Sequence, residues 1–554
     1  MIVMIKKLRS KLFSKKILII FFLFIAFLFR LIDLNNTPSG LHADEASFLL
    51  NAKSILATGR DEDGRLLPFN LHSLIDPKPA LYTYLQVPTV WLFGPSTFAA
   101  RLPAVILGVL SIYLTYLFFK KLNQEKIGFV VLVLLTISPW HIVVSRATQE
   151  VILSFFFFIL ALICFFDLLK YQNKKQYLSL FITAFLSMYA YHSAKILLPL
   201  LILGYLLIVF RQKKITLKTS IKILMMIFLA LSLSFVFQES RTRFASIGIF
   251  GNQEPLNKIF EQTTLATGKA PLLVLRSFYN KPAAYFYQLA KEYLQYFSLD
   301  FLFLSWGEPK RYIVPNHGLF YLINLPFLFL GLFRSTQKKD KTLFYLFLIF
   351  TLLAPLPAAL TAQETPSMIR TFSMVLPICY FIAEGLIYFF SWKKARSLLF
   401  MTLFFSVYLW QIAYFQMQFF IQEKIYQPWS RNKPFSEIAD YVKRIEMDYS
   451  LIYTTNDLRP LYTYFALADL ISLDQLQANP LARNNDDYQI GKYRFNRKAC
   501  DFPEITEGVL YIAEVQCREK NKQLNDLKVL ATISYPDGLP VYHLLTVNND
   551  NETK

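Results

Sequence analysis

Long apolar segments alternate with short polar ones along most of the chain. The first runs from Ile17 to Leu34, and further ones lie near 99–119, 127–145, 151–169, 177–191, 194–210, 219–238, 318–333, 342–361, 371–391 and 397–420. Because a helix needs about 20 apolar residues to cross a bilayer, this pattern predicts about eleven spans with loose boundaries. The expected fold class is therefore an α-helical polytopic membrane protein.

Three polar segments are much longer than the others. They cover residues 35–98, 239–316 and 421–554. We expect a transmembrane domain over 1–420, with the first two segments as its large outer loops, and a separate C-terminal domain over 421–554.

The first loop is not uniformly polar. Ala43–Ala57 and Pro79–Phe93 carry apolar residues at helical spacing. Amphipathic helices on the outer membrane surface and helices packed on the bundle both fit this pattern.

The tail has the pattern of a small α/β domain outside the membrane. Ser436–Met447 is predicted to be a helix, and the predicted strands are Leu451–Thr455, Gly508–Val515, Val529–Tyr535 and Val541–Val547. Cys500 and Cys517 lie in this tail, where a disulfide and free thiols both remain open.

The composition supports the membrane assignment. Hydrophobic residues make up 55% of the chain and charged residues 17%, below the roughly 25% charged residues of soluble domains. Soluble enzymes, disordered or fibrous chains and outer-membrane barrels are excluded.

The net charge of +20 does not indicate a nucleic-acid partner, because the basic residues cluster in short loops between the apolar segments. Those loops all fall on one side, which predicts a cytoplasmic N-terminus. No small-x-small cleavage site lies between the first apolar stretch and Asn35, so we expect a retained span rather than a signal peptide. The expected location is the bacterial plasma membrane.

Two charged groups in the first loop are candidates for chemistry. Asp44 and Glu45 follow the first span closely, and a carboxylate held at the membrane face can deprotonate an acceptor hydroxyl. A helix N-cap is the competing interpretation. Lys78 lies between Pro77 and Pro79, where a rigidly placed ammonium suits a phosphate headgroup and an ordinary turn is the alternative.

Further candidates lie between or beside the spans. Arg146 and Glu150 occupy a short outer connection, as a functional pair or a surface salt bridge. Arg370 opens the tenth span, where it binds an anionic headgroup or anchors the helix. Weaker candidates are Lys195, Arg241 and His317.

The order of several motifs resembles the GT-C glycosyltransferases, in the branch of protein O-mannosyltransferases and bacterial lipid A aminoarabinose transferases. The similar features are the Asp44-Glu45 pair, the Lys78-Pro79 dipeptide, Arg101-Leu102-Pro103 at the second span, and Ser138-Pro139 with Arg146 before the fourth span. Segments 296–303, 318–331 and 355–361 also resemble bacterial members.

This resemblance implies transfer of a single sugar from a polyprenyl-phosphate donor, with inversion, to a protein, lipid or envelope glycan on the extracytoplasmic face. Asp44 would be the base, with Glu45 as its acidic neighbour and Glu150 as a second acidic residue. The donor phosphate would meet Lys78, with Arg370 and Arg146 as further candidates.

No cofactor is required, and a divalent metal near Asp44 and Glu150 is an option that the sequence does not demand. It contains no metal-ligand motif and no nucleotide-binding loop. Two alternatives remain: an oligosaccharide transferase or ligase with a lipid-pyrophosphate donor, and a lipid-sugar flippase or transporter.

Overall fold

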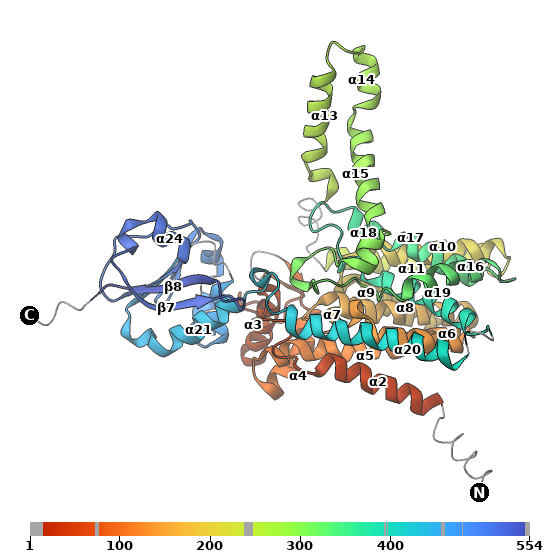
Figure 1. Cartoon of the computed structure of the whole chain (residues 1–554), viewed down its shortest axis with the longest axis horizontal. Helices are drawn as coiled ribbons and strands as arrows, with labels where there is room; N and C mark the ends of the chain where they lie inside the picture. The colour runs from red at the N-terminus through yellow and green to blue at the C-terminus, as the bar shows by residue number, and fades with distance from the viewer. Residues whose placement is uncertain are drawn as a thin grey trace, which may run out of the picture. The chain divides into compact units, whose positions relative to one another are not determined.

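The structure is a computed structural model that describes residues 15–72, 77–237, 248–392, 395, 397–455, 460–478 and 480–548 (Figure 1). Its contacts divide the chain into two compact units. The bundle unit holds residues 1–32 and 104–418, and the loop–tail unit holds residues 33–103 and 419–554. The first loop therefore groups with the C-terminal domain, whereas we expected it to belong to the transmembrane domain.

Seven helical segments among the described residues are long and apolar enough to cross a membrane, so the chain is an integral membrane protein. Four are single helices: α5 (Thr97–Lys121), α8 (Glu150–Tyr171), α10 (His192–Arg211) and α11 (Leu217–Val236). The other three are Thr342–Ala359 with α17 (Thr342–Leu353) and α18 (Leu356–Ala359), Phe372–Phe389 with α19 (Val375–Phe389), and Leu398–Gln422 with α20 (Leu398–Met417).

The remaining expected spans correspond to shorter helices. These are α2 (Lys15–Leu31), α6 (Glu125–Ile137), α9 (Lys174–Ala190) and α16 (Asn324–Thr336). Within the described residues each has 13 or 17 residues, fewer than the roughly 20 that a straight span needs. The count of eleven therefore stays a prediction for these helices.

The break after α6 has a local cause. Pro139 has no N–H to continue the helix, so a separate short helix, α7 (Pro139–Val144), begins there. Near the end of α6, the carbonyls of Leu135 and Thr136 accept hydrogen bonds from the buried guanidinium of Arg30, at 3.1 and 3.2 Å. A cation at a helix C-terminus is favourable, so Arg30 stabilises the kink.

Helices α16 and α19 approach each other closely at a pair of glycines. A Cβ added at Gly331 would lie 1.7 Å from the carbonyl oxygen of Phe381, and one at Gly385 would lie 1.9 Å from that of Phe327. Small residues at such a crossing let the backbones of membrane helices pack directly.

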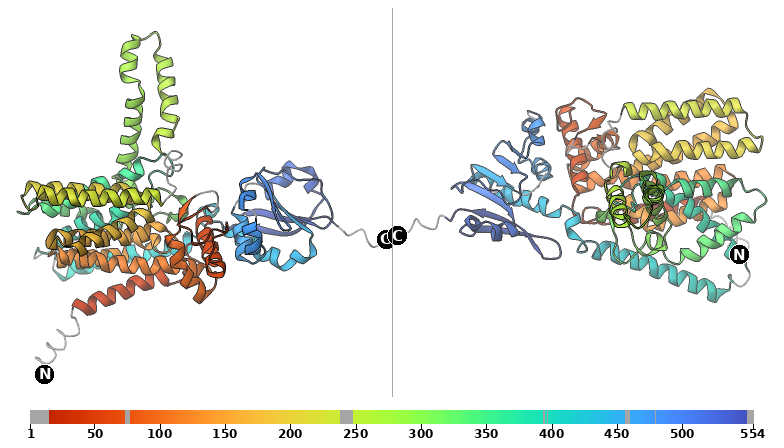
Figure 2. Two further views of the ribbon diagram at one scale, coloured as in Figure 1. Left: turned by 180° about the vertical axis from the view of Figure 1, so that it is seen from behind. Right: turned by 90° about the horizontal axis from the view of Figure 1, so that it is seen from above.

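A helical hairpin extends from the bundle unit (Figures 1 and 2). It consists of α13 (Glu254–Ala266), α14 (Leu272–Phe278) and α15 (Lys281–Gln295), with α13 and α15 packed side by side. Asn280 caps α15 by accepting a hydrogen bond from the Ala283 N–H at 3.0 Å.

The first loop folds into two helices and a small ladder. The helices are α3 (Ala43–Thr58) and α4 (Leu81–Phe93), which pack against each other. Strand β1 (Asn70–Leu71) pairs antiparallel with β2 (Lys78–Pro79). Helix α3 is mostly buried, whereas α4 exposes apolar side chains at its C-terminal end.

The C-terminal domain is built on a six-stranded sheet with the order β4-β5-β3-β6-β8-β7. Its strands are β3 (Leu451–Thr454), β4 (Asp487–Ile490), β5 (Tyr493–Asn496), β6 (Val509–Glu514), β7 (Lys528–Ser534) and β8 (Pro540–Thr546). β3 runs parallel to β5 and β6, and the other pairs are antiparallel. β3, β6, β7 and β8 correspond to the predicted strands, whereas β4 and β5 were not predicted.

Helices cover this sheet, and a disulfide joins two of its flanking segments. The helices are α21 (Lys433–Ile445), α22 (Leu461–Leu467), α23 (Leu473–Ala478) and α24 (Val515–Lys520). Cys500 and Cys517 form the disulfide, with a Cα–Cα distance of 5.1 Å.

The first loop and the tail share one hydrophobic core. Leu49 and Leu50 of α3 lie in the same buried cluster as Ile438 of α21, Phe465 of α22 and Leu510 of β6. The helix that carries Asp44 and Glu45 is therefore packed against the C-terminal domain rather than standing alone on a membrane surface.

Candidate active site

Asp44 and Glu45 lie in the first turn of α3. His42 is the N-cap: its Nδ1 accepts from the Asp44 N–H at 3.2 Å, and Glu45 Oε2 accepts from the His42 N–H at 3.1 Å. This reciprocal pair is a capping box. The capping function therefore belongs to His42 and Glu45, and the side chain of Asp44 makes a different contact.

Asp44 forms an ion pair with Lys78. Lys78 Nζ lies 2.5 Å from Asp44 Oδ1, and the exposed fractions of the two side chains are 4% and 34%. The pairing of β1 with β2 holds the Lys78 backbone, and the Lys78 ammonium lies 5.6 Å from the centre of the Phe48 ring. The result is a solvent-accessible carboxylate whose orientation is fixed by a buried lysine.

Glu45 is enclosed by contrast. Arg101 Nε and Nη2 lie 3.0 and 3.1 Å from its two carboxylate oxygens, and neither side chain is exposed. Arg101 also donates to the carbonyls of Leu34, Pro38 and Gly40. Such a bidentate buried pair fixes geometry, so the structure gives Glu45 a positioning role for the start of α3.

The tail contributes contacts to the same segment. Arg431 Nη2 lies 3.8 Å from Glu45 Oε2, and Arg431 Nε donates to the Ser39 carbonyl at 2.9 Å. The hydroxyl of Tyr464 donates to the carbonyl of Leu41, just before α3. We did not predict the contacts of Arg431 and Tyr464. Arg101 belongs to the Arg101-Leu102-Pro103 motif noted in the sequence, whereas Arg431 and Tyr464 belong to no such motif.

Glu423 is a further buried carboxylate beside this segment. Its Oε2 accepts from the Ser39 N–H at 3.0 Å. Burial raises the pKa of Glu423, against the opposing effect of Arg431 and the Ser39 hydrogen bond. This carboxylate therefore ties the start of the tail to the segment that precedes α3.

In the bundle unit, Arg370 has partners that lie close in sequence. Its Nη1 donates to Thr361 Oγ1 at 2.9 Å and to the Gln363 carbonyl, and its Nη2 lies 3.5 Å from Glu364 Oε2. Arg311 binds the other oxygen of Glu364 at 3.1 Å. The Arg370 side chain is 16% exposed.

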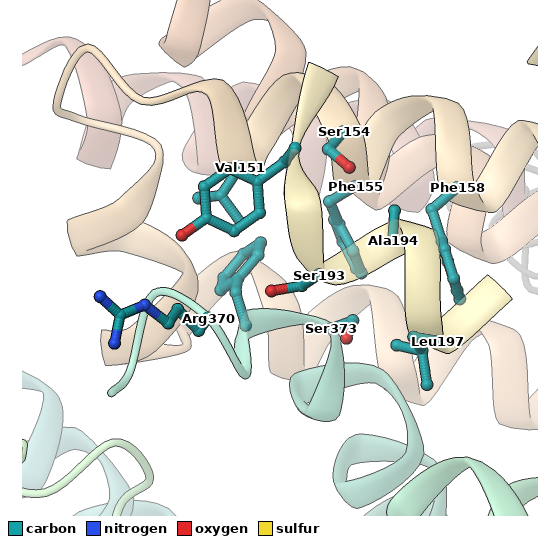
Figure 3. A pocket seen from close by; sticks show the side chains of 11 residues that line it. Val151, Ser154, Phe155, Phe158, Ser193, Ala194, Leu197, Arg370 and Ser373 are labelled. Carbon is teal, nitrogen blue, oxygen red and sulfur yellow. The ribbon is translucent and has the colours of Figure 1, made fainter. Parts of the chain in front are cut away.

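Arg370 lines a pocket within the bundle unit (Figure 3). The polar lining residues are Tyr191, Ser193, Ser154, Ser373 and Arg370, and the apolar ones are Val151, Phe155, Phe158, Ala194, Leu197 and Phe372. In Figure 3, Arg370 lies at one end, and Phe158 and Leu197 lie at the other. The charged end of this small pocket is therefore set apart from its apolar end.

Arg146 and Glu150 occupy the short segment before α8, but their environments differ. Arg146 is fully buried and donates to the Phe29 carbonyl at 2.9 Å. Glu150 is partly exposed at the first position of α8 and directly precedes Val151 of the pocket. Arg146 therefore supports the connection, whereas Glu150 lies next to the pocket lining.

The three weaker candidates have ordinary partners or lie outside the described residues. Lys195 Nζ donates to the Ser234 carbonyl at 3.3 Å and lies over the Phe235 ring. The Nδ1 of His317 lies 2.6 Å from the Gly318 carbonyl oxygen. Arg241 falls in 238–247, outside the described residues.

Across the part of the chain that the structure describes, no group of three or more His, Cys, Asp or Glu side chains is arranged to hold a metal ion. The optional metal therefore stays a prediction, without a ligand set.

Comparison with protein families gives one match. Residues 77–237 match the family model for dolichyl-phosphate-mannose-protein mannosyltransferases. The segment includes Lys78, Arg101 and Glu150 and covers less than a third of the chain; Asp44 and Arg370 lie outside it. The resemblance inferred from the sequence is confirmed over this segment. No curated protein matches the chain.

Comparison with solved structures gives matches at low sequence identity. ArnT from Cupriavidus metallidurans is similar in the apo state (12% identity, TM-score 0.41) and bound to undecaprenyl phosphate (10%, 0.46). Each comparison covers 95% of this chain and 97% of that chain. The archaeal oligosaccharyltransferase AglB from Archaeoglobus fulgidus, in complex with an inhibitory peptide and a dolichol-phosphate, is similar over 96% of this chain and 74% of its own (12%, 0.48).

Proposed function

We propose that this chain is a membrane glycosyltransferase that moves one sugar from a polyprenyl-phosphate donor to an acceptor hydroxyl on a protein, lipid or envelope glycan. The observation that carries the proposal is the contrast between Asp44 and Glu45. Of two adjacent carboxylates, one is enclosed by Arg101 and the other is accessible and oriented by Lys78. An accessible, oriented carboxylate is what a general base requires.

The chemistry needs little beyond a base and a phosphate-binding cation. Asp44 takes the proton of the acceptor hydroxyl as its oxygen attacks the anomeric carbon. The bond between that carbon and the phosphate oxygen breaks, and polyprenyl phosphate leaves with the electron pair. A single displacement inverts the anomeric configuration.

Arg370 binds the departing phosphate in this proposal. Guanidinium–phosphate hydrogen bonds strengthen as negative charge develops on the leaving group. Glu150 would orient the acceptor or a neighbouring cation. Contacts of Lys78 or Arg146 with the donor phosphate stay predictions.

The test measures release of free polyprenyl phosphate from a panel of polyprenyl-phosphate sugars, with cell-envelope extract as the acceptor source. We expect Asp44→Asn to lower the rate roughly 10²–10⁴-fold, the usual contribution of a general base. The matched control is Asp469→Asn, because Asp469 also lies 2.5 Å from a lysine, Lys53, in the same unit. The control should keep wild-type activity.

The products separate the alternatives. A pyrophosphate product would indicate the oligosaccharide-transferring alternative, and sugar movement across vesicles without bond cleavage would indicate a flippase. Activity that survives Asp44→Asn in folded protein would remove Asp44 as the base.

A further inference from the structure

The hairpin α13–α15 is rooted at the end of a candidate span. The Ile249 N–H donates to the Leu360 carbonyl at 3.0 Å, and the Tyr293 hydroxyl donates to the Leu352 carbonyl at 2.8 Å. Leu352 lies in the second half of the span Thr342–Ala359, and Leu360 directly follows it. The hairpin is therefore attached to the C-terminal half of that span.

The hairpin runs across the direction of the bundle helices rather than along it (Figures 1 and 2). Because the bundle helices cross the membrane, an element that starts at their end and runs across them stays near the level of the membrane surface. This direction distinguishes the hairpin from a loop that projects into water.

The surface of the hairpin is unusually apolar for an element with so few protein neighbours. At its tip, Leu273 is 80% exposed and Phe278 is 72% exposed. Along its arms, Phe260 is 75% and Phe286 is 73% exposed. Apolar patches of this kind on a protein mark an interaction site.

The charges around the tip have a single sign. Residues 262–291 contain Lys269, Arg276, Lys281 and Lys291 and no Asp or Glu. Basic residues beside apolar ones are typical of helices that bind an anionic lipid surface. A groove between α13 and α15 is lined by Lys291 and Lys258 together with tyrosines, amides and apolar side chains, and Lys258 there forms an ion pair with Glu254 at 2.6 Å.

We propose that the hairpin α13–α15 is a membrane-interface anchor that lies on anionic phospholipids, with the side chains of α14 in the boundary between headgroups and acyl chains. Lys269, Arg276 and Lys281 would bind the headgroups beside it. The proposal is independent of the transferase activity, since none of these residues belongs to the candidate active site.

The test measures the depth of a fluorophore at the tip. Leu273→Cys is made in a Cys164→Ala/Cys379→Ala background, which removes the two free cysteines. The label then reacts at Leu273→Cys, because Cys500 and Cys517 form a disulfide. The protein carries an environment-sensitive label and is reconstituted at one copy per nanodisc in phosphatidylcholine with phosphatidylglycerol. Lipids with a doxyl quencher near the headgroup or deep in the chain report the depth.

Two reference positions calibrate the signal. Met447→Cys is the reference in the tail, where the Met447 side chain is 88% exposed. Leu399→Cys is the reference on the span helix α20, where the Leu399 side chain is 76% exposed. We expect the shallow quencher to lower the Leu273→Cys emission more than the deep one does. The Leu399→Cys label should be quenched and the Met447→Cys label should not.

Several results would overturn the proposal. One is a tip label that is quenched no more than the Met447→Cys label. Another is stronger quenching by the deep lipid, which would indicate a crossing segment. Quenching that appears only with two copies per disc would assign the surface to a second copy of the chain.

The charges are tested separately with Lys269→Gln/Arg276→Gln/Lys281→Gln. At low salt the triple variant should show weaker shallow quenching than the parent in anionic discs, because each basic residue contributes about fivefold to partitioning. Rising salt screens this contribution, so the parent's quenching should fall towards that of the variant, whose own quenching should change little. Identical salt curves for variant and parent would contradict the role of anionic lipid.

Discussion

The side chains of Glu45 and Arg370 bind partners of very different sequence range. Glu45 binds Arg101, 56 residues away, and the Leu41 carbonyl beside α3 binds Tyr464, 423 residues away. The side-chain partners of Arg370 are instead six to nine residues from it. The first turn of α3 therefore depends on two distant parts of the chain, whereas the side-chain hydrogen bonds of Arg370 stay within its own loop.

This difference separates two kinds of mutational effect. Removing a group that anchors α3 should first destabilise the fold of the loop–tail unit, and any loss of catalysis should follow from that destabilisation. Removing Arg370 should leave the local fold in place, because Glu364 keeps its ion pair with Arg311 and the rest of the pocket lining carries no charge.

Glu45→Gln should destabilise the loop–tail unit by about 3–5 kcal/mol, because it leaves the buried guanidinium of Arg101 without its carboxylate. The measurement is chemical denaturation of purified protein, followed by protection of the tail from proteolysis. Asp469→Asn is the matched control, because its carboxylate is 70% exposed and its loss should be nearly neutral for stability. Equal stability of the Glu45 variant and wild type would contradict a positioning role for Glu45.

Arg370→Ala should weaken binding of polyprenyl phosphate by roughly 10–100-fold, the expected loss for hydrogen bonds to a charged group. The measurement is a titration of the purified protein with the lipid phosphate, alongside a thermal unfolding curve. Arg311→Ala is the control, because Arg311 binds the same Glu364 but does not line the pocket. If both variants lose the same affinity, the effect arises from Glu364 and not from phosphate binding.

The sequence distance between interacting residues also explains which parts of the fold could be predicted. The apolar segments form helices because their composition is a local property, but the break at Pro139 within the expected 127–145 span was not predicted. The strands β4 and β5 were missed because each is only four residues long and carries charged or amide side chains. Short strands of that composition resemble loops until a neighbouring strand is known.

For the candidate site, the sequence and its family resemblance selected Asp44, Lys78 and Arg370. The resemblance implies Asp44 as the base and Glu45 as its acidic neighbour, but the enclosure of Glu45 could not be predicted, because it depends on Arg101. The contacts that Arg431 and Tyr464 make with the segment before α3 leave no motif in the sequence, because these two residues lie hundreds of positions from α3. Contacts of this kind become visible only when the two segments share a core.

Tyr464→Phe gives a milder test of these contacts. It removes the hydrogen bond to the Leu41 carbonyl and should cost about 1 kcal/mol, the net value of a neutral hydrogen bond. Hydrogen exchange should accelerate at the first turn of α3. Tyr441→Phe, whose hydroxyl donates to Leu530 inside the tail, should leave that turn unchanged. Faster exchange in both variants would indicate general destabilisation instead.

The smallest expected effect concerns pH and lies at the far end of α3. Asp63 forms an ion pair with Arg483, and burial, together with Glu62 and Asp61, outweighs that arginine and raises the pKa of Asp63 to about 6. A folded-state pKa above the ordinary value near 3.8 means that Asp63 favours folding most at low pH. This contribution is lost as the pH rises from about 4 through about 6.

Asp63→Asn removes this titration, so the midpoint of thermal unfolding of wild type should fall relative to the variant between pH 4 and pH 7. The expected change is on the order of 1 kcal/mol, or roughly 2–4 °C. Asp469→Asn is the control, because its 70% exposed carboxylate should give a difference from wild type that hardly varies with pH. A difference between wild type and Asp63→Asn that stays constant over this range would show that Arg483 neutralises Asp63 fully. The contact between the first loop and the tail would then be insensitive to pH, and α3 would be held equally at both of its ends.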